Sequence, residues 1–319
     1  MPEAKPAIVV ALTGWKAEPW VARFRALLPG RTILTQAECG AERPARYHLF
    51  CWKPSAEVLA ATPYPLLIAS AGAGVDHILR AKPPAGVPIS RVVDPDLTGR
   101  MVEYVVLHAL MHLRRMPEAA MHQRARRWKG SPMPAAREVT VGLLGIGVLG
   151  QAAAAGLAAL GFRVIGWSRT ARGSLAFETH AGEAGLGPFL AQTDILVSLL
   201  PSTPETRGLI GTTVFRALHR DGAFGPPVFI NAGRGDTVRE DELIVALGDG
   251  TLRAASLDVF TTEPLPEASP LWGMETVILT PHNAADSTPD AVVAGAVAEI
   301  HRFEAGLPLK NLIDPKRGY

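Results

Sequence analysis

Short apolar runs alternate with longer stretches of helical periodicity along most of the chain. The runs are bounded by Gly, Pro or polar residues, which is typical of buried strands. Regular alternation of strands with helices predicts an α/β protein with doubly wound parallel sheets. The predicted strands are Ala7–Leu12, Tyr47–Trp52, Leu66–Ala71, Val139–Leu144, Arg163–Trp167, Ile195–Leu200, Pro227–Asn231, Ala254–Val259 and Thr276–Thr280.

The longest predicted helix extends from Gly99 to about Trp128, with apolar residues three and four positions apart. The preceding Asp94-Pro95-Asp96 is a favourable helix start, so we place a first domain boundary near Leu97. A later helix is predicted over Ala291–Phe303, and its periodicity does not decide to which domain it belongs.

Composition narrows the classes of function. A chain of 319 residues is long enough for two domains, and 48% apolar residues with a net charge of +2 exclude a disordered protein. Near neutrality also argues against a dedicated nucleic-acid or membrane-surface binder. The apolar run at Ala7 to Leu12 is too short for a signal peptide or membrane span, which favours a soluble cytoplasmic protein.

Two local clusters of reactive or charged residues have ordinary interpretations. Cys39 and Cys51 lack the spacing of a zinc or redox motif, so we expect reduced, buried thiols and no metal. Six basic residues crowd one segment with only Glu118 against them, and we favour a solvated helix face or a subunit contact over a nucleic-acid surface. The six are Arg114, Arg115, Arg124, Arg126, Arg127 and Lys129.

A glycine-rich turn follows the strand predicted at Val139–Leu144. Gly145, Gly147 and Gly150 form the pattern GxGxxG, and an Ala-rich helix and a second strand complete a βαβ unit. Gly145 permits the tight turn, Gly147 lets backbone amides approach a pyrophosphate, and Gly150 lets the helix pack closely. We therefore predict a dinucleotide site rather than a bare structural turn, with the amides of Val148 and Leu149 also at the phosphates.

The residues after the second strand of this unit indicate which dinucleotide binds. NAD sites usually carry an acidic residue about 20 residues beyond the turn. Here Ser168-Arg169-Thr170 occupies that position, and a guanidinium with two hydroxyls suits a 2′-phosphate. NADP is the predicted cofactor, with NAD possible at lower preference; the alternative is that Arg169 is only a solvated charge.

Three further motifs lie at the ends of later apolar runs. In a doubly wound fold, ligands bind at the carboxyl ends of the strands. Asn231-Ala232-Gly233-Arg234-Gly235 supplies an arginine, Asp258 to Pro266 supplies Glu263, and Thr280-Pro281-His282 supplies a histidine. Taken singly, the arginine and the glutamate are better explained as surface charges, and the histidine could be a capping residue. The combination is more specific than any one motif.

Together with the nucleotide turn, these residues resemble the D-isomer-specific 2-hydroxyacid dehydrogenase family over nearly the whole chain. Leu200-Pro201-Ser202-Thr203-Pro204-Glu205-Thr206 is similar to that family's LPxTxxT loop beside the cofactor. Ser70 to Asp76, Trp167-Ser168-Arg169 and Arg317-Gly318-Tyr319 are similar to its glyoxylate/hydroxypyruvate reductase A branch. Gly233 departs from the family pattern, in which Ala is commoner, and we expect it to loosen the placement of Arg234 without abolishing activity.

The resemblance implies a Rossmann cofactor domain, residues 99–287, inserted into a flavodoxin-like substrate domain formed by residues 1–98 and 288–319. The active site would lie in the cleft between the two domains. Relatives are dimeric through the region of the basic segment, so a homodimer is expected, with no nucleic-acid or membrane partner.

The implied reaction is NADPH-dependent reduction of a small 2-keto acid, glyoxylate or hydroxypyruvate, to glycolate or D-glycerate. His282 would act as general acid and base, Glu263 would hold its ring and favour the charged form, and Arg234 would bind the substrate carboxylate. Further substrate contacts would come from Trp52, Ala73 and Gly74, although Trp52 is equally well explained as core. Further cofactor contacts would come from Leu200, Pro201, Thr206, Ala232 and Asp258.

Two other functions stay open. A dehydrogenase of a larger D-2-hydroxy acid such as phosphoglycerate would need more basic groups around the substrate and commonly a regulatory domain. A dinucleotide-sensing interaction protein could share the fold, because fold does not fix function. The complete set of Arg, Glu and His favours an enzyme over this last alternative.

Overall fold

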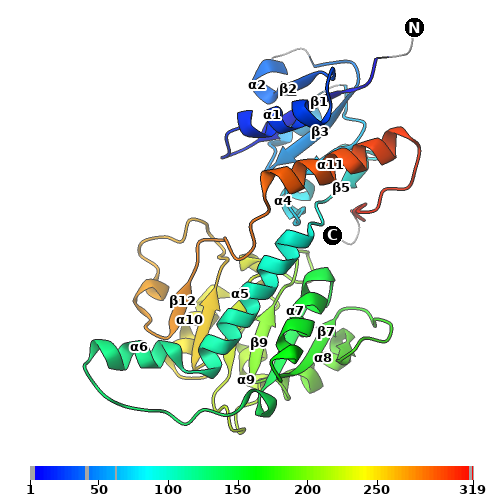
Figure 1. Ribbon diagram of the computed structural model, residues 1–319. Coiled ribbons are helices and arrows are strands. Elements are labelled where there is room, and N and C mark those ends of the chain that lie inside the picture. Colours follow the sequence, from blue (N-terminus) through cyan, green and yellow to red (C-terminus); the bar gives the residue numbers. More distant parts are fainter. Residues whose placement is uncertain (1–3, 40–42, 62, 316–317, 319) are drawn as a thin grey trace. The chain divides into compact units, whose positions relative to one another are not determined.

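The computed structural model describes residues 4–39, 43–61, 63–315 and 318, and the chain divides into two units (Figure 1). The first unit combines Met1–Leu97 with Ser287–Tyr319, and the second is Thr98–Asp286. Arg317 and Tyr319, which contribute to the family resemblance, lie outside the described residues.

The first unit is built on a parallel sheet of five strands in the order β2-β1-β3-β4-β5. Every pairing between neighbouring strands is parallel, and the order is that of flavodoxin-like folds. The strands are β1 (Ala7–Leu12), β2 (Ile33–Thr35), β3 (Tyr47–Trp52), β4 (Ile68–Ser70) and β5 (Ile89–Ser90).

Alternate side chains of β1 enter different cores on the two faces of this sheet. Ile8 and Val10 pack with α1 (Glu18–Leu27) and α11 (Pro289–Glu304), whereas Ala7 and Val9 face the other core. That second core is covered by α2 (Gln36–Cys39), α3 (Ala56–Ala60) and α4 (Asp76–Arg80). The C-terminal helix therefore belongs to the first unit, a point that periodicity left open.

A polar cluster that includes the buried His48 joins the end of α11 to the amino-terminal part of the first unit. Glu304 accepts hydrogen bonds from Arg31, and its Oε1 lies 3.0 Å from Nε2 of His48. Burial lowers the pKa of His48 more than the Glu304 contact raises it. The helix is thus held by polar contacts as well as by its apolar face.

The second unit contains a parallel sheet of seven strands in the order β12-β11-β10-β9-β6-β7-β8. Numbered from β6, the order from β8 to β12 is 3-2-1-4-5-6-7, which extends the Rossmann order. The prediction of two doubly wound parallel sheets, one flavodoxin-like and one Rossmann, is confirmed. The strands are β6 (Thr140–Leu144), β7 (Arg163–Ser168), β8 (Glu178–Ala181), β9 (Ile195–Ser198), β10 (Val228–Asn231), β11 (Ala254–Leu257) and β12 (Val277–Leu279).

Helices cover both faces of this sheet. One core receives Val141 and Leu143 and is closed by α5 (Pro95–Leu113) and α7 (Val148–Ala159). The other receives Leu144 and Leu196 and is closed by α8 (Gly182–Leu190), α9 (Thr212–Ala217) and α10 (Glu240–Gly248). Short 3₁₀ turns lie at Ala136–Glu138, Gly235–Thr237 and Pro270–Gly273.

The single long helix predicted from Gly99 to Trp128 is wrong. The structure has α5, which begins at Pro95, and a separate α6 (Met116–Arg124). Arg115 between them has φ of 53° in the left-handed region, and Pro117 cannot donate the hydrogen bond that a helix interior requires. A second left-handed residue, Arg126, follows the end of α6.

Candidate active site

The predicted chemical groups of the second unit follow the carboxyl ends of its strands. The glycine turn follows β6, the loop of Leu200 and Pro201 follows β9, and the Arg234 loop follows β10. Asp258 comes directly after β11, and His282 three residues after β12. Since the strands are parallel, these loops emerge at one edge of the sheet, the edge at which ligands of this fold bind.

The glycine turn has the backbone that a pyrophosphate site requires. Gly145 has φ of 98°, and a Cβ there would lie 3.0 Å from the backbone oxygen of Leu199. A Cβ at Gly150 would overlap the backbone oxygen of Gly145, so the first turn of α7 packs directly on the loop. A Cβ at Gly147 would meet no described atom within 4 Å. This open side faces away from the packed contacts, and the amide groups of the α7 amino terminus suit a phosphate.

Gly233 does not provide the loosening that the sequence suggested. Its φ is not in the left-handed region, and a Cβ there would lie 2.7 Å from the backbone oxygen and 2.8 Å from the backbone nitrogen of Leu200. Glycine is therefore favoured here by close backbone packing, because a Cβ would force the Leu200 backbone to shift, and not by conformational freedom. The segment Leu199–Leu200 is enclosed between Gly145 and Gly233, which ties the phosphate turn to the Arg234 loop.

His282 and Glu263 form a pair on two adjacent loops. Nδ1 of His282 lies 2.8 Å from Oε2 of Glu263, and the other carboxylate oxygen accepts a hydrogen bond from the amide of Phe260 at 3.1 Å. Both side chains are partly exposed, at 39% and 28%. The contact fixes the plane of the imidazole and leaves Nε2 as the nitrogen able to exchange a proton with a ligand.

Asp258 organises the loop that carries His282. Three successive backbone amides donate to it: that of His282 to its carbonyl oxygen at 2.8 Å, and those of Asn283 and Ala284 to its carboxylate at 3.0 and 3.1 Å. His282 consequently has φ of 53°, a strained conformation that persists where surrounding contacts enforce it. Oδ1 also accepts from the hydroxyl of Thr280 at 2.6 Å, whereas Oδ2 accepts only a share of the Ala284 amide at 3.1 Å among the described residues, so Oδ2 has the larger remaining capacity for a cofactor amide.

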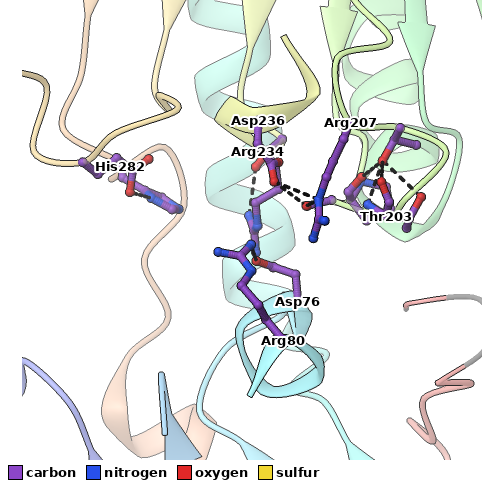
Figure 2. Close-up of polar contacts among 12 residues, drawn as sticks. Asp76, Arg80, Thr203, Arg207, Arg234, Asp236 and His282 are labelled. Atoms are coloured by element: carbon purple, nitrogen blue, oxygen red, sulfur yellow. Dashed lines mark hydrogen bonds and ion pairs between the residues drawn. The ribbon is translucent and has the colours of Figure 1, made fainter. Parts of the chain in front are cut away.

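Hydrogen bonds to the backbone carbonyl of Arg234 stabilise the loop on which this residue lies (Figure 2). Its carbonyl accepts hydrogen bonds from the hydroxyl of Thr237 at 2.7 Å and the side-chain amide of Asn231 at 3.3 Å. The guanidinium donates to the carbonyl of Gly233 at 2.8 Å. A Cβ at Gly235 would overlap the backbone of Phe260, so this loop also packs tightly on the Asp258–Glu263 segment.

The loop after β9 has the internal hydrogen bonds expected of a rigid turn. The hydroxyl of Thr206 donates to the carbonyl of Pro201 at 2.6 Å and accepts from the amide of Thr203 at 2.8 Å. Leu200 is buried, and Ala232 at the end of β10 donates its amide to Ser198. These predicted cofactor contacts are thus set on backbone that side-chain packing holds in place.

At the carboxyl end of β7, the three predicted phosphate donors, Ser168, Arg169 and Thr170, differ, and Thr170 is an exposed residue. The Ser168 hydroxyl, on a buried residue, donates to the carbonyl of Thr170 at 2.8 Å, so its one proton is already used. Arg169 is 41% exposed and pairs with Glu205 at 3.2 Å. Arg169 is therefore a cation of this loop that a phosphate could reach, and Arg172 in the same loop is exposed as well.

In the first unit, Trp52 lies over the loop after β4. A Cβ at Gly72 would overlap the Trp52 ring, and Ser70 donates to the carbonyl of Gly72 at 2.9 Å. Trp52 stacks on Trp15 with ring centroids 5.0 Å apart and an angle of 10° between planes. β1 and β3 pair in the sheet, and the chain leaves them in opposite directions, so Trp15 and Trp52 lie at the switch point of this sheet. Ala73 and Gly74 follow in the same partly exposed loop.

Comparison with known proteins decides the family. Residues 106–284 match the family model described as D-isomer specific 2-hydroxyacid dehydrogenase, NAD binding domain. The chain is 37% identical over 311 residues to glyoxylate/hydroxypyruvate reductase A of Yersinia enterocolitica, covering 96% of this chain and 97% of that protein. The chain belongs to the D-isomer specific 2-hydroxyacid dehydrogenase family.

Two solved structures of family members are similar to this one. A probable 2-hydroxyacid dehydrogenase from Rhizobium etli, in complex with NADP, HEPES and L(+)-tartaric acid, has a TM-score of 0.92 and 44% identity, covering 99% of this chain and 100% of that chain. The NADPH-dependent glyoxylate/hydroxypyruvate reductase from Sinorhizobium meliloti, in complex with NADP and sulfate, has a TM-score of 0.91 and 42% identity with the same coverage.

Several residues of this family member that shape the site were not predicted. Tyr104 in α5 bonds to Thr280 at 3.0 Å and so adds to the Asp258 network, and Arg207 lies 3.4 Å from Asp236 beside the Arg234 loop (Figure 2). Trp15 is a third. The sequence spacing of hydroxyl and aromatic residues in a helix or loop does not indicate whether they contact a site. Thr280 was noted in the sequence only as the residue before Pro281.

No group of three or more His, Cys, Asp or Glu residues in the described part of the chain is arranged to hold a metal ion. Among the same residues, no helix is both long enough and apolar enough to cross a membrane.

Proposed function

We propose that the protein reduces small 2-keto acids, glyoxylate and hydroxypyruvate, with NADPH to give glycolate and D-glycerate. The observation that carries the proposal is the 2.8 Å His282–Glu263 pair, set at the same sheet edge as Arg234 and a glycine turn suited to a pyrophosphate. The reductases named above support the choice of substrate, and the NADP complexes support the choice of cofactor.

Bound NADPH would supply the hydride, and the chain's residues would bind and orient it. Gly145, Gly147 and the first amides of α7 would hold the pyrophosphate, and Arg169 the 2′-phosphate. Val148, Leu149, Leu200, Pro201, Thr206 and Ala232 keep their proposed contacts with the dinucleotide. The Oδ2 atom of Asp258 would accept from the carboxamide.

His282 would deliver the proton that the reduced carbonyl oxygen needs. Because Glu263 occupies Nδ1, the transferred proton is held at Nε2 of His282. The Glu263 carboxylate stabilises the protonated imidazole before transfer and keeps the ring from turning. In the oxidative direction the same nitrogen would accept the proton.

Arg234 would bind the substrate carboxylate through two parallel hydrogen bonds and polarise the carbonyl. Trp52, Ala73 and Gly74 keep their proposed contacts with the keto acid, and the two segments of the first unit keep their assignment as the substrate domain. The rigid backbone around Arg234 supports this role, since a fixed guanidinium loses little freedom when a ligand binds.

We also propose a homodimer working in a reducing cytoplasm. Trp128 in the basic segment is fully exposed, and exposed aromatic residues mark contact surfaces. Within that segment, Arg124 pairs with Glu275 at 3.2 Å and Arg115 with Glu118 at 3.6 Å, which reduces the charge available to nucleic acid. Cys39 and Cys51 are buried and form no disulfide, as a reducing compartment requires.

The test is NADPH oxidation by the purified protein against a panel of 2-keto acids, with NADH in parallel. The panel includes glyoxylate, hydroxypyruvate, phosphohydroxypyruvate and a longer aliphatic keto acid. We expect turnover of the two smallest acids with NADPH preferred, and a change of Arg169→Ala to remove most of that preference. Binding of NADPH without turnover of any acid would instead favour a dinucleotide-sensing protein.

A further inference from the structure

An exposed ion pair lies at the end of the cofactor site. NH1 of Arg169, just after β7, is 3.2 Å from Oε2 of Glu205, in the loop after β9. β7 and β9 are the two neighbours of β6 in the sheet, so both loops border the glycine turn that follows β6. The side chains are 41% and 56% exposed, so either partner is open to exchange with a solute.

The Glu205 carboxylate is held in place independently of the arginine. The hydroxyl of Thr203 donates at 2.8 Å to Oε2, the same oxygen that contacts Arg169. Thr203 is buried and is itself tied to Thr206. The Thr203 hydroxyl, followed by the backbone amide of Glu205 itself, lowers the pKa of this carboxyl, and Arg169 contributes less. The carboxylate therefore stays ionised and fixed at neutral pH whether or not Arg169 is paired with it.

We propose that Glu205 determines cofactor selectivity by competing with the cofactor's 2′-phosphate for Arg169. The inference rests on the proposed function, in which Arg169 binds that phosphate. The phosphate and the carboxylate carry charge of the same sign and need the same guanidinium donors. NADH has no 2′-phosphate and leaves the ion pair intact. Glu205 thus weakens the binding of NADPH but not that of NADH. The preference for NADPH over NADH is therefore lower than it would be if Arg169 had no carboxylate partner at Glu205.

The size of the effect follows from the exposure of the pair. Solvent-exposed ion pairs contribute little free energy. Removing the Glu205 charge should therefore strengthen NADPH binding by only about two- to fivefold. Salt screens exposed charges over a Debye length of about 10 Å at 0.1 M, so the gain should shrink as ionic strength rises.

The experiment compares Glu205→Gln with the unaltered protein. Glutamine keeps an oxygen to accept from Thr203, so the loop retains its hydrogen bond while the charge is lost. The dissociation constants of NADPH and NADH are measured by fluorescence titration, and the KM values by steady-state reduction of glyoxylate. We expect the ratio of the NADPH constant to the NADH constant to fall about two- to fivefold. An unchanged ratio, or a higher one, would overturn the proposal.

A matched control lies at the opposite end of β7, where Arg163 begins this strand and Glu178 begins the neighbouring β8. Arg163 and Glu178 form an exposed pair at 2.8 Å near the amino end of β7, with exposures of 51% and 45%. A Glu178→Gln change removes the same charge from the same unit at the opposite end of the strand. It should leave the cofactor ratio as it is; an equal shift in this variant would mean that net charge alone acts, and the proposal would fail.

Combination with Arg169→Ala separates this inference from the proposed function. If Arg169→Ala leaves the cofactor ratio unchanged, the proposed phosphate site itself is wrong. If Arg169→Ala raises the ratio and Glu205→Gln does nothing, only the competition is wrong. In the double variant we expect most of the Glu205→Gln gain to disappear. A gain as large as in the unaltered background would show that Glu205 acts without Arg169 and would also overturn the proposal.

Discussion

Nδ1 of His282 lies 2.8 Å from Oε2 of Glu263, although the two residues are 19 positions apart on separate loops. The Glu263 carboxylate also accepts a hydrogen bond from the backbone amide of Phe260. The Glu263 side chain therefore stabilises both its own loop and the orientation of the imidazole. The orientation of the His282 ring therefore depends on the loop between β11 and β12 as well as on the loop that carries the histidine.

Replacement of His282 by alanine should lower kcat for glyoxylate reduction by about 10²- to 10⁴-fold, the usual contribution of a general acid. The dissociation constant of NADPH should not change, because the pyrophosphate turn is untouched. Glu263→Gln should give a smaller loss, since glutamine can still bond to the ring. Stopped-flow kinetics and NADPH titration measure these effects, and undiminished turnover in His282→Ala would exclude the acid–base role.

Arg234→Lys tests the geometry of carboxylate binding while keeping the charge. A lysine ammonium cannot form two parallel hydrogen bonds to a carboxylate, so kcat/KM for the keto acid should fall by about 10²-fold. Arg163→Lys, on an exposed position at the amino end of β7, is the control and should leave kcat/KM as it is. Equal rates for Arg234→Lys and the unaltered protein would show that only the charge matters.

Gly233→Ala tests the close contact with Leu200. A methyl group 2.7 Å from the Leu200 oxygen must displace backbone, which borders both the Arg234 loop and the phosphate turn. We expect KM for NADPH and KM for the keto acid to rise together. Gly187→Ala in α8, where a Cβ meets no described atom within 4 Å, should retain both values. A rise in only one KM for Gly233→Ala would contradict the coupling between these two loops.

His112 in α5 should make folding sensitive to mild acid. Burial is the main cause that lowers its pKa from 6.5 to about 3, and its Nε2 lies 2.8 Å from the hydroxyl of Ser256. As the pH falls, the unfolded chain binds this proton before the folded one. The contribution to stability is thus complete above about pH 6.5 and is lost progressively below it, reaching a loss of about 2 kcal/mol at pH 5.

The measurement is urea unfolding at pH 7 and pH 5, followed by circular dichroism. His112→Gln removes the titrating group and keeps a polar side chain toward Ser256. Between the two pH values, this variant should lose about 2 kcal/mol less of unfolding free energy than the unaltered protein. The same loss in both proteins would mean that other groups, such as His48 in the first unit, account for the acid sensitivity.

The sequence was sufficient for the central strands and for the edge strand β12, and insufficient for the other edge strands, β2, β5 and β8. Strands such as Ile195–Ser198 are fully buried and therefore apolar apart from the final serine, which makes them visible as runs. β8 (Glu178–Ala181) is a polar edge strand with little burial, and β2 and β5 have only three and two residues, so no pattern marks them. The break at Arg115 was missed because the apolar spacing continues across it.

Site prediction was limited in a different way. The glycine turn could be predicted because its backbone geometry demands a residue type at each position, as the contacts of Gly145 and Gly150 show. The pairing of His282 with Glu263 could not, since nothing in their spacing brings them together; the family resemblance suggested it. For Gly233 the residue was noticed but its reason was wrong, because tertiary contact with Leu200 is invisible in sequence.

The position of α11 has a consequence for synthesis on the ribosome. The core that holds Ile8 and Phe24 also needs Val293 and Ile300, and Arg31 and His48 both contact the carboxylate of Glu304. Domains commonly fold in the order in which they emerge, amino-terminal first. Here the core of the amino-terminal sheet stays incomplete until α11 (Pro289–Glu304) has left the exit tunnel, whereas the second unit already holds all the strands of its sheet before α11 is made. We expect nascent chains ending before residue 289 to need chaperone protection over α1 and β1.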